Sequence, residues 1–446
     1  MSPRRRSTLK QLLSLIREGR FDEFIGRAEE LDPVDLADVL AGLDDDERLD
    51  LVRRLPPELS SHALVEMPDE SHAEDTLAAL DPSVAADIVE ELEDDDAADL
   101  LGELEVDEQE RILAEVEDRE DVDRLLRYDE ETAGGLMTGH LVTVRSGQTV
   151  NDALDSIRHQ AEEVEDFSQV FVTDDADRLI GVLSFKSLVV SSADRPVVEV
   201  MEEADLTVGP EVDQEEVARL MARYNVPSIA VVDREGRLLG RVTFDDVIDV
   251  VEAETTEDIL RFGGVSADEE LGATWGSAVR SRLPWLYLNL LTAFMAASVV
   301  VFFQDTIART VALAAWMPII AGMGGNAGTQ ALVVTVRRLA IGQIPDSKKL
   351  GVILKEFLVG AINGLAIGLV VGAVAFMTGQ GPRLGLVVFL AMTANLVVAG
   401  FAGAFVPIVL QRLGIDPAIA SSIFVTTFTD MVGFALLLGL AGGVLL

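Results

Sequence analysis

The chain has 446 residues and no cysteine, and this absence excludes several kinds of site. Without a thiol there is no disulfide framework, no zinc–thiolate centre and no cysteine nucleophile. Histidine is scarce too, and the four residues His62, His72, His140 and His159 lack metal-ligand spacing. The sequence has no phosphate-binding loop, nucleophile elbow or triad signature. We therefore expect a protein that is not an enzyme and does not hydrolyse ATP.

Basic residues are few and unevenly placed. The chain has 35 Lys and Arg against 77 Asp and Glu, so its formal net charge is −42. From Ser281 onward there are 5 acidic and 9 basic residues, whereas residues 1–280 hold 72 acidic and 26 basic ones. Such an acidic region repels nucleic acid, which we do not expect as a partner, and attracts cations. Solubility tuning or adaptation to high salt would produce the same excess of surface acids.

Long hydrophobic runs are confined to the C-terminal part, where each is long enough to cross a bilayer. The loop 337–356 between two of them carries five basic residues, which places it in the cytoplasm. We predict a multi-pass protein of the inner (plasma) membrane with a cytoplasmic N-terminal region and an outside C-terminus. The basic first ten residues have no apolar segment behind them, so no secretory signal is expected. The five predicted spans are Leu283–Phe303, Val311–Val336, Phe357–Phe376, Leu384–Leu410 and Pro417–Leu446.

Residues 1–130 contain a short repeat. Each unit opens with Asp or Pro and continues with apolar residues at helical spacing, which is a helix-start signal. One such unit cannot bury its apolar face alone, but stacked units can. We therefore predict an acidic, all-α superhelical N domain. Its units begin at Asp32, Asp44, Pro57, Asp69, Asp81, Asp94 and Asp107.

Residues 137–252 contain a mixed helix and strand pattern twice. Both copies read helix, β-branched strand, turn, strand and helix, and together they resemble a tandem pair of α/β CBS domains over 137–196 and 197–252. In such pairs a Ser/Thr-x-x-Asp after the last strand commonly binds nucleotide. Thr243 and Asp246 fit this pattern, whereas Ser184 and Ser187 of the first copy lack the acid. One site for ATP or another adenine nucleotide and an unoccupied structural pair both stay open.

Asp430 is the most informative residue of the chain. It lies near the middle of the apolar run Pro417–Leu446, with Thr426 one helical turn before it. A carboxylate at membrane depth costs at least ~2.5–3.5 kcal/mol, so it usually faces a water-filled path or a cation. The flanking Thr and Gly residues favour a polar, closely packed lining. A protonated Asp bonded to threonine hydroxyls is the alternative.

The second predicted span carries Gly324-Gly325-Asn326-Ala327-Gly328-Thr329-Gln330. Pro318 and the glycines predict a broken helix with free carbonyls, which is tolerated only where protein or water covers them. Asn326 and Gln330 are four residues apart and share one helical face. Amides at this depth suit either the lining of a pathway or a tight dimer contact.

Acidic residues recur at helical spacing in the region before the spans. Asp95 and Asp99, and also Asp246 and Asp249, share a helical face and repel one another unless water or a cation lies between them. Hard divalent cations prefer oxygen ligands, and Mg²⁺ uses one or two carboxylates while it keeps several waters. A third set lies in the connector 253–280 and comprises Glu254, Glu257 and Asp258.

The order of parts resembles the MgtE family of magnesium channels across nearly the whole chain. The Gly-Gly-Asn-Ala-Gly-Thr-Gln run and Thr-Thr-Phe-Thr-Asp-Met-Val-Gly-Phe are similar to its most specific motifs. The resemblance implies a homodimer with a pore domain over 281–446, a plug helix over 253–280 and Asp430 of each subunit on hydrated Mg²⁺. Asn225 stands where a sensor Asp is expected. The sensor residues implied are Asp95, Asp99, Glu215, Asp246, Asp249, Glu254, Glu257 and Asp258.

This resemblance implies Mg²⁺ uptake that internal Mg²⁺ shuts off by bridging the acidic faces. One rival is a carrier or exchanger for another divalent ion such as Co²⁺ or Mn²⁺, although Asp430 offers no soft ligand. The other is a nucleotide-regulated anion pore, which would need basic residues inside the spans. The span interiors contain none.

Overall fold

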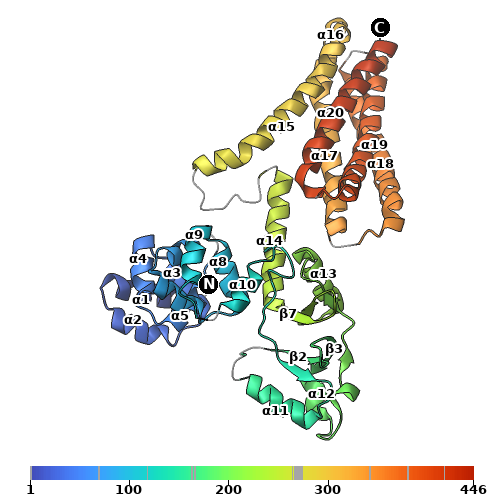
Figure 1. Ribbon diagram of the computed structural model, residues 1–446. Helices are drawn as coiled ribbons and strands as arrows, with labels where there is room; N and C mark the ends of the chain where they lie inside the picture. Colours follow the sequence, from blue (N-terminus) through green and yellow to red (C-terminus); the bar gives the residue numbers. More distant parts are fainter. Residues whose placement is uncertain are drawn as a thin grey trace. The chain divides into compact units, whose positions relative to one another are not determined.

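The elements follow one another along the chain in the order that the sequence predicts (Figure 1). In this computed structural model they form two compact units, Met1–Glu252 and Ala253–Leu446, each of which is described by itself. The structure describes residues 3–68, 71–117, 119–161, 164, 167–263, 265, 275–340, 343–378, 381–415 and 417–445.

The first unit opens with short helices that start where the repeat predicts. Asp32 caps α3 by accepting a hydrogen bond from the Val34 N–H at 3.1 Å, and Asp44 caps α4 through the Glu47 N–H at 2.9 Å. The predicted start at Asp69 lies outside the described residues. The helices are α1 (Pro3–Arg17), α2 (Phe21–Ala28), α3 (Pro33–Ala41), α4 (Asp45–Val52), α5 (Pro57–Val65), α6 (Ala73–Ala78), α7 (Pro82–Val89), α8 (Asp94–Gly102), α9 (Val106–Leu113) and α10 (Glu120–Leu125).

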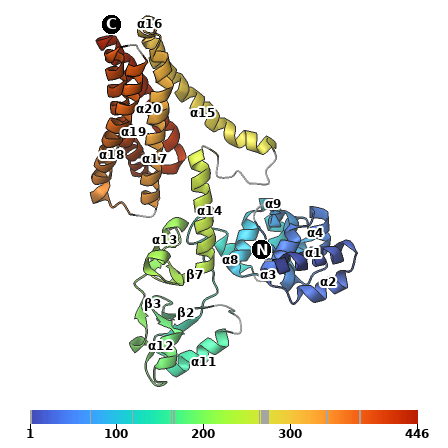
Figure 2. The same cartoon turned by 180° about the vertical axis from the view of Figure 1, so that it is seen from behind.

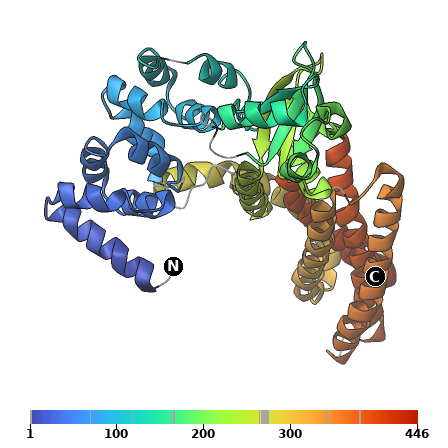
Figure 3. The same ribbon diagram turned by 90° about the horizontal axis from the view of Figure 1, so that it is seen from below.

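These helices stack as a solenoid, which confirms the predicted superhelix. Helix α3 packs on α5, α5 on α7 and α7 on α9, while α8 packs on α10. Figure 3 shows the helices following one another along an arc. One apolar face of each repeat enters a shared core, to which successive helices contribute Phe24, Leu40, Leu64, Ile88 and Leu101.

Two matching α/β layers complete the first unit. The first sheet has the order β1-β2-β3-β4 and the second β5-β6-β7; in each, the first two strands are parallel and the next pair antiparallel. The copies join reciprocally, because the Leu179 N–H donates to the Gly236 carbonyl and the Leu238 N–H to the Asp177 carbonyl. The elements are β1 (Thr143–Arg145), α11 (Val150–Gln160), β2 (Gln169–Thr173), β3 (Leu179–Ser184), α12 (Phe185–Val190), β4 (Glu202–Glu203), β5 (Thr207–Val208), α13 (Gln214–Tyr224), β6 (Ser228–Val232), β7 (Leu238–Thr243) and α14 (Phe244–Gly263).

The helical domain and the second α/β copy share one core. Leu101 and Leu125 belong to the same apolar cluster as Val217 and Val242. The linker between them adds a backbone bridge, since the Thr138 N–H donates to the Arg241 carbonyl at 2.9 Å. This packing places α8 and the start of α14 within one unit.

The connector differs from its predicted form. Instead of a separate plug helix, α14 continues from the second α/β copy to Gly263, and α15 (Trp275–Phe302) begins inside the segment 253–280. The reason is physical: Phe244–Gly263 contains neither proline nor an internal glycine, so nothing stops the helix at residue 252. The proposed domain boundaries stay a prediction.

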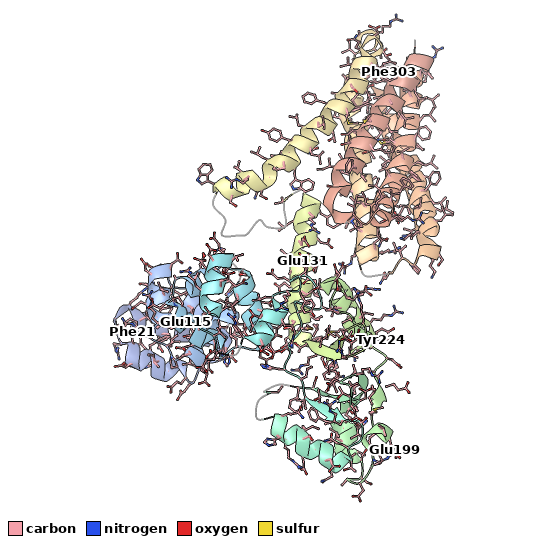
Figure 4. The ribbon with its side chains drawn as sticks, viewed as in Figure 1. Phe21, Glu115, Glu131, Glu199, Tyr224 and Phe303 are labelled. Atoms are coloured by element: carbon pink, nitrogen blue, oxygen red, sulfur yellow. The ribbon has the colours of Figure 1, made fainter. Side chains whose placement is uncertain are left out.

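Among its described residues, the second unit contains five helices long and apolar enough to cross a membrane, as predicted. Helix α19 packs against α17, α18 and α20 (Figure 2), and α15 packs against α20. Phe303, before the short α16 (Gln304–Arg309), packs near Gly439 of α20 (Figure 4). The remaining helices are α17 (Leu313–Ala340), α18 (Lys349–Met377), α19 (Pro382–Arg412) and α20 (Pro417–Val444).

The predicted break at Pro318 is wrong. Helix α17 runs through this proline and through the glycines that follow. Proline in a helix removes one backbone hydrogen bond, and packing against α19 and α20 holds α17 together despite that loss. The glycines serve close packing instead, because a Cβ at Gly328 would lie 2.6 Å from Val425 Cγ1.

Candidate functional site

Asp430 lies near the middle of α20 in the second unit, called the membrane unit below, and is partly exposed. Thr426, one turn before it, is exposed, whereas Thr429 is fully buried and donates its hydroxyl to the Thr426 carbonyl at 2.8 Å. A carboxylate, a free hydroxyl and nearby backbone thus occupy one stretch of an otherwise apolar helix. Oxygen groups of this kind can replace or hold the water shell of a hard cation.

Helix α17 brings its amides to the same neighbourhood. Asn326 and Gln330 are both exposed in this unit. Gly325 lies beside Thr426, since a Cβ built on Gly325 would be 3.5 Å from Thr426 Cγ2. The structure therefore packs the stretch of α17 that carries Asn326 directly against the stretch of α20 that carries Thr426.

Asn395 is a residue of this region that the sequence reasoning missed. It lies on α19 with no exposed surface, and its Nδ2 donates to the Ile320 carbonyl of α17 at 3.0 Å. The signal was visible, because Thr393-Ala394-Asn395 interrupts an apolar predicted span. The amide was overlooked because it carries no charge.

A second site lies in the first unit, where α8 meets the start of α14. Asp95 is 8% exposed, and its Oδ1 has no hydrogen-bond partner among the described residues. Burial, with repulsion from Asp246, Asp96 and Glu93, raises the pKa of Asp95 to about 8. Burial and repulsion from Asp246 and Glu93 also raise the pKa of Asp96 to about 7. These carboxylates crowd together without enough compensating charge.

Asp246, at the start of α14, completes this cluster. Burial raises its pKa, although its hydrogen bond with Thr243 acts in the opposite direction. Burial of part of the Asp99 side chain, with repulsion from Asp96 and Asp246, raises its pKa to about 7. The rest of this side chain is exposed, whereas Asp95 is buried. The structure thus brings Asp95 and Asp99 close enough to Asp246 for their charges to repel. Their role as metal ligands stays a prediction.

Asp249 lies one turn further along α14 and is exposed. Its charge contributes to the raised pKa of Glu66, at the end of α5, after burial as the first cause. Glu66, Glu93 and Asp96 were not predicted as members of the site. The acidic run Glu93-Asp94-Asp95-Asp96 was the available signal for Glu93 and Asp96. Helical spacing to Asp99 selected only Asp95 from this run.

The other predicted sensor residues lie elsewhere. Glu215 is exposed on α13, and its backbone N–H donates to Asp213 Oδ1 at 2.9 Å. Glu254, Glu257 and Asp258 lie on the part of α14 that belongs to the second unit, where Glu257 forms an ion pair with Arg261. Asn225 ends α13 in the left-handed region at φ 54°, a conformation that Asn tolerates well. A role of Glu215, Glu254, Glu257 and Asp258 in sensing Mg²⁺ stays a prediction.

Thr243 and Asp246, the predicted nucleotide residues, contact each other. Thr243 Oγ1 lies 2.7 Å from Asp246 Oδ2, and the Thr243 N–H donates to the same oxygen at 3.2 Å. In the first copy, Ser184 Oγ accepts from the Ser187 N–H at 3.2 Å. The Asp246 carboxylate thus belongs both to the predicted nucleotide motif and to the acidic cluster.

These features define a membrane protein with polar and carboxylate groups among its apolar helices and an acidic helical domain joined to two α/β domains. Residues 317–440 match the MgtE model, described as divalent cation transporter. Residues 31–131 match the MgtE intracellular N domain, and residues 133–194 and 197–253 match CBS domains.

The comparison with curated relatives agrees. The chain is 38% identical over 325 residues to the magnesium transporter MgtE of Thermus thermophilus, which covers 72% of each chain. It is 36% identical over 311 residues to that of Enterococcus faecalis, covering 70% of this chain and 68% of the relative. The chain belongs to the MgtE family, which confirms the resemblance and the three-part fold. Members of this family are transporters, not enzymes.

A solved structure is similar to the first unit. It is the cytosolic domain of the Mg²⁺ channel MgtE in complex with ATP, with a TM-score of 0.51 and 35% identity, over 54% of this chain and 99% of that one. The match supports the arrangement of helical domain and CBS pair described above.

Proposed function

We propose that this protein is a homodimeric channel for Mg²⁺ uptake across the plasma membrane, closed from inside by Mg²⁺. The pathway is proposed from Asp430 on α20, one helical turn after Thr426, which lies beside Gly325 of α17. Asp430 of each subunit would face a hydrated ion, with Asn326, Gln330 and Thr426 as polar lining. The names of the curated relatives support Mg²⁺ as the ion. Carboxylate, amide and hydroxyl oxygens suit a hard cation.

The acidic cluster supports regulation by Mg²⁺. Asp95, Asp96 and Asp246 offer carboxylate oxygens as ligands, and the buried Asp95 Oδ1 has no hydrogen-bond partner in the described part of the chain. A cation there would offset the burial and the repulsion that raise the pKa values of these carboxyl groups. At low Mg²⁺ the faces would separate and the pore would open; at high Mg²⁺ the closed state would gain stability, because Mg²⁺ binds it more tightly. Further sensor sites would use Asp99, Asp249, Glu215, Glu254, Glu257 and Asp258.

Orientation follows from charge. The segment 337–356, which joins the last turn of α17 to the first turns of α18, favours the cytoplasmic side because it is basic. Its basic residues are Arg337, Arg338, Lys348, Lys349 and Lys355. With five spans, the large acidic region then lies inside and the C-terminus outside. A sensor on the inner side gives negative feedback on uptake.

Binding of an adenine nucleotide at the CBS pair is a second proposal. It rests on Thr243 and Asp246 and on the ATP bound by the similar cytosolic domain. Because Asp246 also belongs to the acidic cluster, a nucleotide there would influence Mg²⁺ regulation.

The pathway is tested by Asp430→Ala in liposomes with an imposed membrane potential. We expect Mg²⁺ flux to fall at least about tenfold, because a barrier change of only ~1.4 kcal/mol has that effect. Asp430→Asn separates charge from shape, and Asp305→Asn on the exposed α16 is the control. Wild-type flux in both Asp430 variants would exclude the pore role.

The same liposomes distinguish a channel from a carrier. Flux of a channel follows the imposed potential and needs no second ion. Measured coupling to Na⁺ or H⁺, or transport of Co²⁺ or Mn²⁺ in preference to Mg²⁺, would favour the carrier.

A further inference from the structure

Asn395 joins three helices at one point of the membrane unit. Its Nδ2 donates to the Ile320 carbonyl on α17 at 3.0 Å. A Cβ on Gly324 of α17 would lie 2.3 Å from this nitrogen, and one on Gly433 of α20 would lie 2.8 Å from it. Such distances are far below van der Waals contact, so both glycines are needed to admit the amide.

The orientation of the amide follows from its partner. A backbone carbonyl only accepts hydrogen bonds, so the nitrogen of Asn395 must face Ile320. This leaves Oδ1 buried, with no partner among the described residues. A buried acceptor without a donor lowers stability. An aliphatic residue of similar size would avoid that cost, so stability alone does not account for asparagine here.

The place of Asn395 relates it to the cation pathway. Ile320 lies one helical turn before Gly324-Gly325-Asn326, and Gly433 lies three residues after Asp430. The hydrogen bond from Asn395 to Ile320 thus restrains α17 against sliding along its own axis. This restraint lies near the level at which α20 carries the Asp430 carboxylate. Apolar side chains alone would allow the helices to slide, because lipid and protein are equally apolar and helix pairing depends on close packing and polar contacts.

We propose that Asn395 is a positioning residue that holds the Asn326 segment of α17 in register with Asp430 and thereby sets the discrimination between Mg²⁺ and other divalent cations. It does not contact the ion. A shift of α17 along α20 would change the spacing between amide and carboxylate oxygens, and selectivity between ions of equal charge depends on such spacing. This inference rests on the proposed pathway through Asp430.

Two variants and a control test the proposal in the full-length protein. Asn395→Leu keeps the branched shape of the side chain, although leucine is larger, and removes the hydrogen bond. Asn395→Ser is smaller and serves if leucine does not fit. The control is Thr393→Val on the same helix, because the Thr393 hydroxyl also donates to a carbonyl of a neighbouring helix, Gly364 of α18, at 3.0 Å.

We expect the ratio of Mg²⁺ to Mn²⁺ flux in liposomes to fall about fivefold in the Asn395 variants, the effect of losing one hydrogen bond. The melting temperature identifies the variants that fold, because the loss of the unpaired Oδ1 and the larger size of leucine act on stability in opposite directions. Thr393→Val should leave the flux ratio unchanged.

An unchanged ratio in the folded Asn395 variants, or an equal change in Thr393→Val, would overturn the inference. Asp430→Ala is measured alongside. If Asp430→Ala conducts normally, the pathway itself is wrong; if only the Asn395 variants behave as wild type, the positioning role alone fails.

Discussion

At the scale of single residues, the informative acids are those whose charge is hard to accommodate. Asp95 is buried among acids, in contrast to Asp155, which is exposed and pairs with Arg158 at 2.6 Å. An exposed ion pair contributes little to stability. A buried carboxylate beside other carboxylates must be protonated, bound to a cation or moved into water. The burial and crowding of these carboxyl groups, which raise their pKa values, are the physical basis of the proposed switch.

The same acids predict a pH dependence in the absence of Mg²⁺. The pKa values of Asp95 and Asp96, about 8 and about 7, lie above the ordinary 3.8. The packed arrangement therefore holds protons that the separated one releases, so its stability is full below the ordinary pKa and is lost as pH rises through about 7 to 8. We expect protease resistance of residues 1–252 in the full-length protein to fall over that window.

Variants separate this effect from general alkaline loosening. In the double variant Asp95→Asn, Asp96→Asn the loss of resistance should be largely absent, and Asp155→Asn should behave as wild type. Added Mg²⁺ should restore resistance at pH 8 in the wild type. A pH profile that is identical in wild type and double variant would show that these carboxylates do not control the packing.

At the scale of elements, α18 and α19 are joined by a row of glycines on α18. Gly360, Gly364, Gly368 and Gly372 recur every four residues, and a Cβ on any of them would lie within 3.0 Å of an atom of α19. Small residues at this spacing let two helices approach closely in a membrane.

Gly360→Ala should therefore destabilise the membrane unit. Its new Cβ would lie 2.5 Å from the Leu396 carbonyl oxygen, which is backbone and cannot turn aside. Overpacking of this kind typically costs about 1–3 kcal/mol. Gly351→Ala on the same helix is the control, since a Cβ there would lie more than 4 Å from every other described part of the chain outside its own turn of helix. Equal melting temperatures of the two variants in detergent would contradict the close packing.

At the scale of the whole molecule, the uneven charge allows two interpretations. Generic surface acids respond to ionic strength and accept Na⁺ or K⁺ as substitutes. A bridging site needs a small divalent ion with oxygen ligands. The difference lies in which ion compacts the acidic region.

We predict that millimolar Mg²⁺ protects residues 1–252 from protease in ~0.15 M monovalent salt, where the Debye length is already about 8 Å. The quadruple variant Asp95→Asn, Asp99→Asn, Asp246→Asn, Asp249→Asn should lose this protection. Its Mg²⁺ flux should no longer depend on the internal Mg²⁺ concentration. Equal protection by added KCl alone would identify the acids as generic.

Much of the molecule was predictable because its signals are local. Asp32 and Asp44 mark helix starts through their own side chains, and the two CBS copies repeat the same strand and helix order. Five spans follow from hydropathy, and Asp430 is conspicuous by its charge alone. The prediction of a break at Pro318 was wrong, because it used a local rule, whereas packing against neighbouring helices keeps α17 continuous across this proline.

The sequence by itself therefore determined the parts: a helical repeat, a duplicated α/β domain, five apolar helices and one acid at membrane depth. Only the tertiary structure decided which parts meet. Asn395 bonds to a residue 75 positions away, and Asp95 on α8 repels Asp246 on α14. Periodicity and hydropathy indicate which face of a segment is apolar and whether the segment can lie in water or in lipid. They carry no information on distant partners, which are selected by side-chain packing across the fold.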